Sequence, residues 1–284
     1  MAWLTWSFIP LLAVTIWLIS THITTTFPTL RNKRIVLLIA HPDDEAMFFS
    51  PSVLALTAPN LGNHLKILCL STGNADGLGA IRRNELVQSG LLLGLRSAED
   101  VLVLDDPRFP DSMSQDWDET AIAELLGSTF VPAAAAAATK RKADRPLEAN
   151  IDVLVTFDVQ GVSSHPNHIS LYRGARAFVA GLVKGRPGWD DPVKLYVLPS
   201  TGVARKYSSI LDVPFTILWR LMGKNKAGEY PDPLVFVNGA GGYRKGQRAM
   251  TAAHRSQMRW FRWAWIGVSR YMVVNELTRI KAAS

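Results

Sequence analysis

Short apolar runs rich in β-branched residues recur along the chain, and stretches with helical periodicity lie between them. The runs and their flanking turn residues predict strands over residues 34–40, 66–70, 101–104, 151–156 and 193–198. The intervening stretches predict helices over residues 80–93, 118–130 and 166–180. Strands that alternate with helices form a mostly parallel sheet with both faces covered, so the pattern predicts an α/β fold.

Two histidine clusters stand where such a sheet binds ligands. His41-Pro42-Asp43-Asp44-Glu45 directly follows the first strand, and His165-Pro166-Asn167-His168 begins the last of these helices. Ligands of open α/β sheets bind beyond the carboxyl ends of the strands, so we expect the two clusters to meet there. A catalytic zinc ion takes about three nitrogen or oxygen ligands from the protein and keeps one position open for water. Two imidazoles and one carboxylate supply these ligands, and a further carboxylate remains for proton transfer.

The first cluster taken alone has a second interpretation. Asp43 or Asp44 can cap a helix start by accepting hydrogen bonds from free backbone amides. The presence of His165 and His168 in the second cluster favours the metal site over a simple cap. Glu45 is expected to support the site or the helix start rather than to bind metal.

Composition limits the chain to one catalytic domain with appendages. A chain of 284 residues with 48% hydrophobic content can bury one α/β core, and a second domain is hard to fit. The net charge of +7 suits an anionic phospholipid surface or a phosphate-bearing substrate, and no nucleic-acid recognition motif accompanies it. Cys69 is the single cysteine, which excludes an internal disulfide and a thiolate metal cluster and indicates a reducing, cytosol-facing domain.

The N-terminal segment predicts a membrane anchor. Residues 2–20 contain no charged side chain and are about long enough to cross a bilayer core. Tryptophans, which favour membrane interfaces, stand near both ends of this segment at positions Trp3, Trp6 and Trp17. A cleavable signal peptide is the alternative, but a basic start and a clear cleavage site are missing. The first charged residues that follow are Arg31, Lys33 and Arg34. Their positive charge predicts a cytoplasmic catalytic domain.

We therefore divide the chain into an anchor and linker, residues 1–30, and a catalytic domain, residues 31–284. An alanine-rich, charged stretch near 132–149 is expected to be a solvated insertion. Residues 255–274 predict an amphipathic helix with aromatic and basic side chains. Two placements of that helix remain open, at a membrane interface or packed against the domain.

Several motifs beyond the two clusters carry a resemblance to a known family. They are residues 71–77, Arg82-Arg83-Asn84-Glu85-Leu86, residues 156–158 and residues 254–258. With the two clusters, they make the chain resemble the PIG-L/LmbE-like zinc de-N-acetylase family. The resemblance implies a Rossmann-like LmbE fold behind one N-terminal transmembrane helix. It also implies an enzyme of the endoplasmic reticulum membrane whose catalytic domain faces the cytoplasm.

The same resemblance implies roles for individual residues. His41, Asp44 and His168 become ligands of Zn²⁺ or of another divalent transition metal, and Asp43 becomes the general base that later protonates the leaving amine. A protonated His165 would stabilise the oxyanion of the tetrahedral intermediate.

Two further residues receive roles from the resemblance. Asp111 matches a carboxylate that orients His165, and Arg82 matches a residue that contacts substrate. An ion pair of Arg82 with Glu85, one helical turn away, is the alternative for that arginine.

The function that follows is hydrolysis of the acetamide of N-acetylglucosaminyl-phosphatidylinositol, a membrane glycolipid, in the second step of glycosylphosphatidylinositol-anchor biosynthesis. Deacetylation of a soluble N-acetylglucosamine conjugate is one alternative. A non-catalytic membrane scaffold with a structural metal is another, although a structural site has no need of Asp43.

Overall fold

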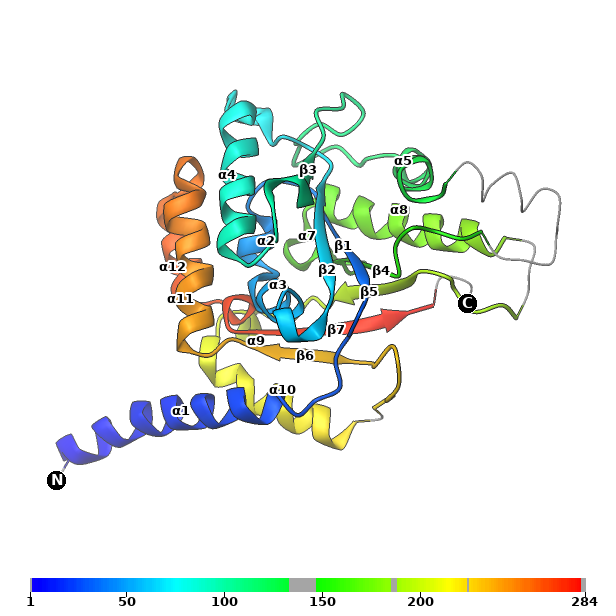
Figure 1. Cartoon of the computed structure of the whole chain (residues 1–284). Coiled ribbons are helices and arrows are strands. Elements are labelled where there is room, and N and C mark those ends of the chain that lie inside the picture. Colours follow the sequence, from blue (N-terminus) through cyan, green and yellow to red (C-terminus); the bar gives the residue numbers. More distant parts are fainter. Residues whose placement is uncertain (1, 133–146, 185–187, 224, 282–284) are drawn as a thin grey trace.

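The computed structural model describes residues 2–132, 147–184, 188–223 and 225–281, with side chains from Leu11 onward. A seven-stranded sheet with the order β3-β2-β1-β4-β5-β7-β6 forms its centre (Figure 1). The strands are β1 (Arg34–Ile39), β2 (His64–Cys69), β3 (Val101–Val103), β4 (Val153–Phe157), β5 (Lys194–Leu198), β6 (Leu234–Val237) and β7 (Val274–Ile280). Strands β1 to β5 pair in parallel, and β7 runs antiparallel to both β5 and β6. The predicted α/β fold is confirmed.

Helices cover both faces of this sheet (Figure 1). Helices α5 (Glu119–Phe130) and α8 (Pro166–Leu182) pack on each other and lie against one face. The other side carries α2 (Asp44–Met47), α3 (Ser50–Leu56), α4 (Gly79–Leu92) and α11 (Ala240–Arg248). Because both faces are covered, β4 and β5 are buried along their whole length, and their sequences are apolar apart from Thr156 and Lys194. The predicted strands and helices between residues 34 and 198 match β1 to β5, α4, α5 and α8 to within a few residues.

The last part of the chain differs from its prediction. The helix expected near 255–274 is only α12 (Trp260–Val268), and the chain then enters β7. Strand β7 inserts between β5 and β6, so its pairing partners are far away in sequence. The predicted insertion near 132–149 lies mostly outside the described residues, since 133–146 are not described.

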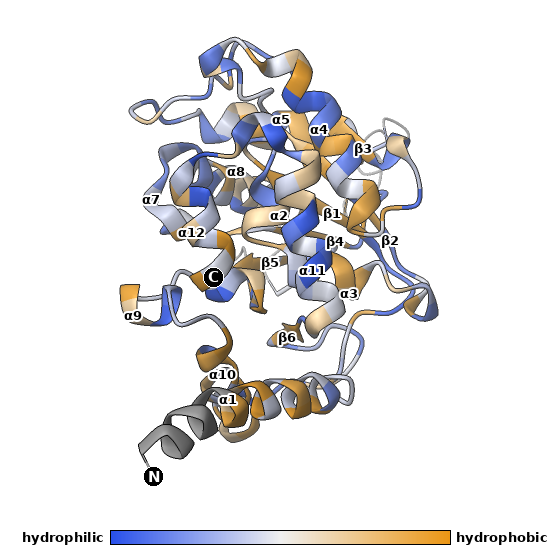
Figure 2. Ribbon diagram, turned by 90° about the vertical axis from the view of Figure 1, so that its left-hand side faces the viewer, coloured by the Kyte–Doolittle hydropathy of each residue, from blue (hydrophilic) through white to orange (hydrophobic). Residues whose placement is uncertain are grey.

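Helix α1 (Ala2–Thr24) lies beside α10 (Asp212–Met222) at the edge of the domain near β6 (Figures 1 and 2). The predicted anchor, residues 2–20, falls partly outside the described side chains. Within the part of the chain that is described, no helix combines the length and apolar composition needed to cross a membrane. Trp17 is buried and donates its indole N–H to the Asn238 carbonyl oxygen at 2.8 Å, which fixes this part of α1 on the domain.

Candidate metal and catalytic site

The turn after β1 holds the Asp44 carboxylate in one orientation. Asp44 Oδ2 accepts hydrogen bonds from the backbone N–H groups of Ala40 and His41, both at 3.0 Å. Burial raises the pKa of the Asp44 carboxyl, but the neighbouring His168 and His41 rings and these backbone donors bring it below its ordinary value. Asp44 is therefore an ionised, oriented carboxylate whose other oxygen, Oδ1, faces His168.

His168 enters from the first turn of α8 and meets that oxygen. Its Nδ1 lies 3.0 Å from the Gly161 carbonyl oxygen, which accepts a hydrogen bond from Nδ1–H of the neutral ring. The ring stacks on Phe157 with centroids 3.9 Å apart and planes within 2°. Nε2 is buried without a hydrogen-bond partner and lies 3.2 Å from Asp44 Oδ1. An imidazole that is held through Nδ1 and directs a buried Nε2 toward a carboxylate is the arrangement expected of a metal ligand.

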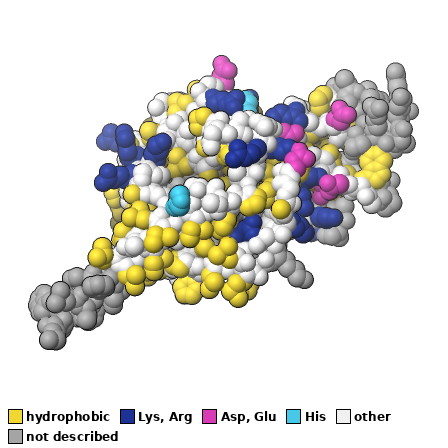
Figure 3. Space-filling model, turned by 60° about the horizontal axis from the view of Figure 1, so that its bottom comes forward, with side chains coloured by type: hydrophobic (Ala, Val, Ile, Leu, Met, Phe, Trp, Pro, Cys, Tyr) yellow, Lys and Arg dark blue, Asp and Glu magenta, His cyan; other side chains and the backbone are white. Residues whose placement is uncertain are grey.

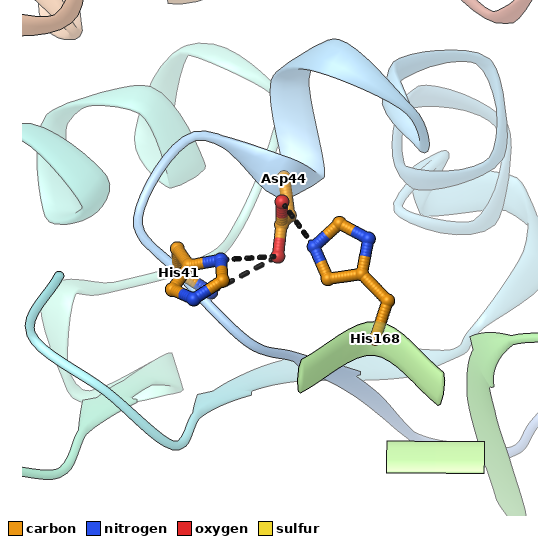
Figure 4. Close-up of side chains that lie close together, drawn as sticks. All are labelled: His41, Asp44 and His168. Atoms are coloured by element: carbon orange, nitrogen blue, oxygen red, sulfur yellow. Dashed lines mark hydrogen bonds and ion pairs between the residues drawn. The ribbon is translucent and has the colours of Figure 1, made fainter. Parts of the chain in front are cut away.

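His41 completes the predicted ligand set (Figure 4). One ligand atom each from His41, Asp44 and His168 lies within 4.8 Å of the others. Nδ1 of His41 is 4.0 Å from Asp44 Oδ2, and its Nε2 is 3.0 Å from Asn167 Oδ1. Burial lowers the pKa of His41, which favours the neutral ring that a metal binds. The donor set of two imidazoles and one carboxylate fits a zinc ion with an open position.

His165 lies next to this cluster. Its ring is 4.7 Å from that of His41 and 5.0 Å from that of His168, centroid to centroid. Burial and the two neighbouring rings lower the pKa of His165 to about 4. The protonated ring implied by the resemblance is therefore disfavoured near neutral pH. Nδ1 accepts the Asn167 backbone N–H at 3.2 Å, so the neutral ring carries its proton on Nε2 and can still donate it.

Asp111 lies among the histidines of the site, with a carboxylate oxygen within 4.8 Å of ring nitrogens of both His41 and His165. Its carboxylate lies 3.3 Å from His41 Nε2 and 3.4 Å from Arg82 Nη1. Among the described residues it makes no hydrogen bond to His165, the ring it was expected to orient. Asp111 therefore acts on His41 from the side opposite Asp44, which is where a carboxylate strengthens an imidazole ligand.

Arg82 binds groups of this chain on three sides. Its two terminal nitrogens donate to the carbonyl oxygens of Pro42 at 2.9 Å and Gly73 at 2.6 Å. The alternative ion pair with Glu85 is wrong, since Glu85 instead accepts from the backbone N–H and hydroxyl of Ser256. Arg82 thus joins the loops after β1 and β2, with Nη2 at 3.8 Å from Asp43 Oδ2.

Gly73 is expected to be essential for this placement of Arg82. Its φ of +65° disfavours any side chain, and a Cβ here would overlap the Arg82 guanidinium. Gly73→Ala should lower activity at least about tenfold, because a displaced Arg82 releases the loop that carries Asp43. Gly77→Ala is the matched control, with a φ of +73° and no atom within 4 Å of the new Cβ. Both variants should lose about 1–2 kcal/mol of stability from the backbone alone. Equal activities of the two variants would show that Arg82 does not position the loop.

Asp43 has an unusual backbone conformation and a partner that the sequence did not reveal. Its φ of +125° is rare for a residue with a side chain and marks a constrained position. Its Oδ2 forms an ion pair with Arg262 of α12, so the C-terminal helix reaches the site. The indole of Trp265 donates to the Met47 carbonyl oxygen at 3.0 Å and fixes the inner face of α12. The sequence left two placements open for residues 255–274. The inner face of α12, which carries Trp265, packs on the domain.

A buried ion pair supports the turn that follows β1. Glu45 and His254 are fully buried, and His254 Nε2 lies 2.7 Å from Glu45 Oε1. Burial lowers the pKa of His254, but the Glu45 carboxylate raises it above its ordinary value. Glu45 also accepts the Asp43 backbone N–H at 3.2 Å. The expected supporting role of Glu45 is confirmed, whereas nothing in the sequence indicated its pairing with His254.

Loss of this pair should be costly. His254→Ala leaves the Glu45 charge buried without its partner, so we expect the free energy of unfolding to fall by about 3–5 kcal/mol. Arg173→Ala removes one partner of an exposed pair with Asp116 and should cost about 1 kcal/mol or less. Chemical denaturation monitored by tryptophan fluorescence measures both. Similar losses for the two variants would contradict the assignment.

Comparison with known proteins identifies the family. The PIG-L profile, described as GlcNAc-PI de-N-acetylase, matches residues 36–179, a span that contains both histidine clusters. The chain belongs to this family. A relative from Arthroderma benhamiae named N-acetylglucosaminyl-phosphatidylinositol de-N-acetylase is 48% identical over 300 residues, covering 89% of each chain. A relative from Schizosaccharomyces pombe, named a probable enzyme of the same activity, is 36% identical over 251 residues, covering 87% of each.

The PIG-L fold also has a structural counterpart. The N,N'-diacetylchitobiose deacetylase from Pyrococcus horikoshii superposes with a TM-score of 0.51, covering 88% of this chain and 84% of that one. Its sequence identity is 16%, so the similarity supports the fold alone.

Proposed function

We propose that the chain is a zinc-dependent hydrolase that removes the acetyl group of N-acetylglucosaminyl-phosphatidylinositol, with glucosaminyl-phosphatidylinositol and acetate as products. This is the second step of glycosylphosphatidylinositol-anchor biosynthesis. The observation that carries the proposal is the convergence of His41, Asp44 and His168 beside a further carboxylate, Asp43, in a member of the PIG-L family. The names of the relatives supply the substrate.

His41, Asp44 and His168 would hold the metal ion. Their ligand atoms converge, and Asp44 is ionised. The buried Nε2 of His168 points into the cluster toward Asp44. When bound, zinc would polarise the acetamide carbonyl and lower the pKa of water at the open position to about 7.

Asp43 carries the proton through the reaction. Its carboxylate takes a proton from the attacking water as the water oxygen bonds to the acetamide carbon. The resulting carboxylic acid then protonates the amine nitrogen as the carbon–nitrogen bond breaks, leaving acetate and a free amino group. Arg82 and the buried Glu45 bind the carbonyl and the N–H of the peptide group between Pro42 and Asp43, which holds Asp43 in place for this transfer.

His165 stabilises the negative charge of the intermediate. Its neutral ring donates from Nε2 to the oxyanion, and loss of such a donor costs about 3 kcal/mol in the barrier. Asp111 and Asn167 hold the outer edge of His41 through contacts at 3.3 and 3.0 Å. We assign Arg82 to positioning the loops after β1 and β2. Its guanidinium also borders Asp43, and at that point it would contact the substrate.

We further propose that the protein resides in the endoplasmic reticulum membrane with its catalytic domain in the cytoplasm. The uncharged segment 2–20 supports attachment to the membrane, and the basic residues at Arg31, Lys33 and Arg34 support that orientation.

Acetate release tests the proposed activity. The full-length protein, purified in detergent and loaded with one equivalent of zinc, should release acetate from N-acetylglucosaminyl-phosphatidylinositol. A headgroup analogue without acyl chains distinguishes the glycolipid from a soluble conjugate as the substrate. A folded, zinc-loaded protein that deacetylates neither compound would contradict the proposal and favour the scaffold alternative.

A further inference from the structure

The outward face of α10 is apolar along the whole helix. Leu218 and Trp219 are 55% and 73% exposed, and no charged side chain interrupts the exposed positions from 211 to 222. The exposed large side chains of this face are Leu211, Phe215, Leu218, Trp219, Leu221 and Met222. Figure 3 shows hydrophobic side chains gathered on this side of the molecule. Contiguous exposed patches of this kind mark an interaction surface.

The inward face of α10 combines buried polar side chains with the apolar Val213 and Ile217, so the helix carries apolar residues on both faces. Asp212, Thr216 and Arg220 recur every four residues and are at most 5% exposed. Asp212 accepts from Arg270 Nε at 2.6 Å and from Arg205 Nε at 2.7 Å. A surface helix in water turns its apolar face to the core and its charged face outward. Helix α10 instead exposes an unbroken apolar face, and its buried ion pairs prevent it from rotating that face inward.

Helix α1 adds to the exposed apolar surface of α10. The Arg220 guanidinium lies 5.4 Å from the ring of Phe27, in the segment that follows α1. Helix α1 lies beside α10 (Figure 2). It presents further exposed apolar side chains. These are Leu11, Leu12, Leu18 and Ile19, which are 48% to 63% exposed. The apolar surface therefore spans two helices that the fold holds side by side.

Basic residues border the surface on the neighbouring helix α11. Tyr243 of α11 packs edge-on against Trp17 of α1, with ring centroids 6.2 Å apart. The next two residues, Arg244 and Lys245, are exposed. An apolar face bordered by cations matches a phospholipid leaflet, whose acyl chains accept the apolar side chains while phosphates attract the basic ones.

We infer that α10 and α1 together form a lipid-binding face, with α10 lying in the boundary between headgroups and acyl chains of one leaflet. The inference deepens the proposed function, because it rests on a bilayer lipid being the substrate. A second copy of the chain fits less well, since residues 2–10 continue α1 with an uncharged sequence that a bilayer can also receive.

The lipid-binding face is linked to the candidate site. The segment Ser209–Leu211 precedes α10, and Ser209 Oγ donates to the Gly267 carbonyl oxygen of α12 at 3.3 Å. Tyr207 packs on Trp265 of the same helix at 5.9 Å. Helix α12 also carries Arg262, the partner of Asp43. The face would thus present the site to a headgroup that remains anchored in the leaflet.

Site-specific labelling tests the face without relying on activity. Phe215→Cys and Met222→Cys, each carrying an environment-sensitive fluorophore, are placed in the full-length protein in vesicles of phosphatidylcholine and phosphatidylinositol. The native Cys69 is buried, so the introduced thiol is the accessible one. Spin-labelled lipids should quench both labels at least about twofold more strongly than a label at Ser128→Cys on α5. Quenching equal to that at Ser128, or shielding that follows protein concentration instead of lipid, would overturn the inference.

A charge on the face tests its role in catalysis. Leu218→Glu should raise KM for the glycolipid in vesicles about tenfold and leave kcat/KM for the headgroup analogue within about twofold of wild type. Leu102→Glu on β3 is the matched control, a leucine 49% exposed on the described surface away from α10, and should change neither. Equal KM values for the two variants would contradict the inference. Inactivity of the wild-type protein on both substrates would instead contradict the proposed function. The quenching experiment would then still decide whether α10 contacts lipid.

Discussion

Asp43→Asn is expected to retain zinc and to lose turnover by about 10²–10⁴-fold. The amide has nearly the shape of the carboxylate but cannot take the proton of the attacking water. The ligand atoms of His41, Asp44 and His168 are unchanged by the substitution, so metal content should stay near one equivalent. Metal analysis and kcat for acetate release, measured on the same preparation, test both halves of this expectation.

The same chemical change at an exposed position supplies the control. Asp116 lies on the surface and pairs with Arg173 at 3.2 Å. Asp116→Asn should therefore leave turnover unchanged. An Asp43→Asn protein with a near-normal rate would remove this carboxylate from the mechanism, whereas loss of zinc from it would show that Asp43 belongs to the metal site.

His168→Ala is expected to lose the metal itself. Substitution of groups that merely orient a ligand weakens metal binding by 10–100-fold, so loss of a direct ligand should weaken it by at least about 100-fold. Activity should fall with zinc content and recover in part at high zinc concentration. Competition with a chromogenic chelator measures the affinity.

Folding has to be separated from ligation in this experiment. The His168 ring is buried and stacks on Phe157, so alanine also leaves a cavity. His168→Gln fills more of that space and should lose zinc equally. His64→Ala serves as the matched control, because His64 pairs with Asp100 far from the ligand cluster. Wild-type zinc affinity in both His168 variants would contradict the ligand assignment.

The candidate site contains residues with strained backbone conformations, which neighbouring hydrogen bonds and ion pairs hold in place. Asp43, Val162 and Ser164 all have positive φ values, at +125°, +58° and +61°, and all three flank the converging ligands. Such conformations persist only when surrounding contacts over-determine them. Arg82 and the Glu45–His254 pair supply these contacts on the β1 side. Distant residues thus stabilise the geometry that the reaction needs.

Local patterns were sufficient for the central sheet and for the residues that converge. Apolar runs predicted β1 to β5, because strands of a sheet that is covered on both faces are mostly apolar. His41 and Asp44 follow β1, and His168 begins α8, so the parallel topology alone brings them to one edge.

Only the tertiary structure decided the partners of these residues. Arg262 reaches Asp43 across 219 positions, and His254 reaches Glu45 across 209. Asp111 contacts His41 at 3.3 Å, a pairing that the sequence did not indicate. The orientation of α10, with an apolar face exposed, likewise depends on the burial of Asp212 and Arg220. Periodicity records which positions share a face of one element, whereas the pairing of distant elements and the environment of each face arise when the whole chain packs.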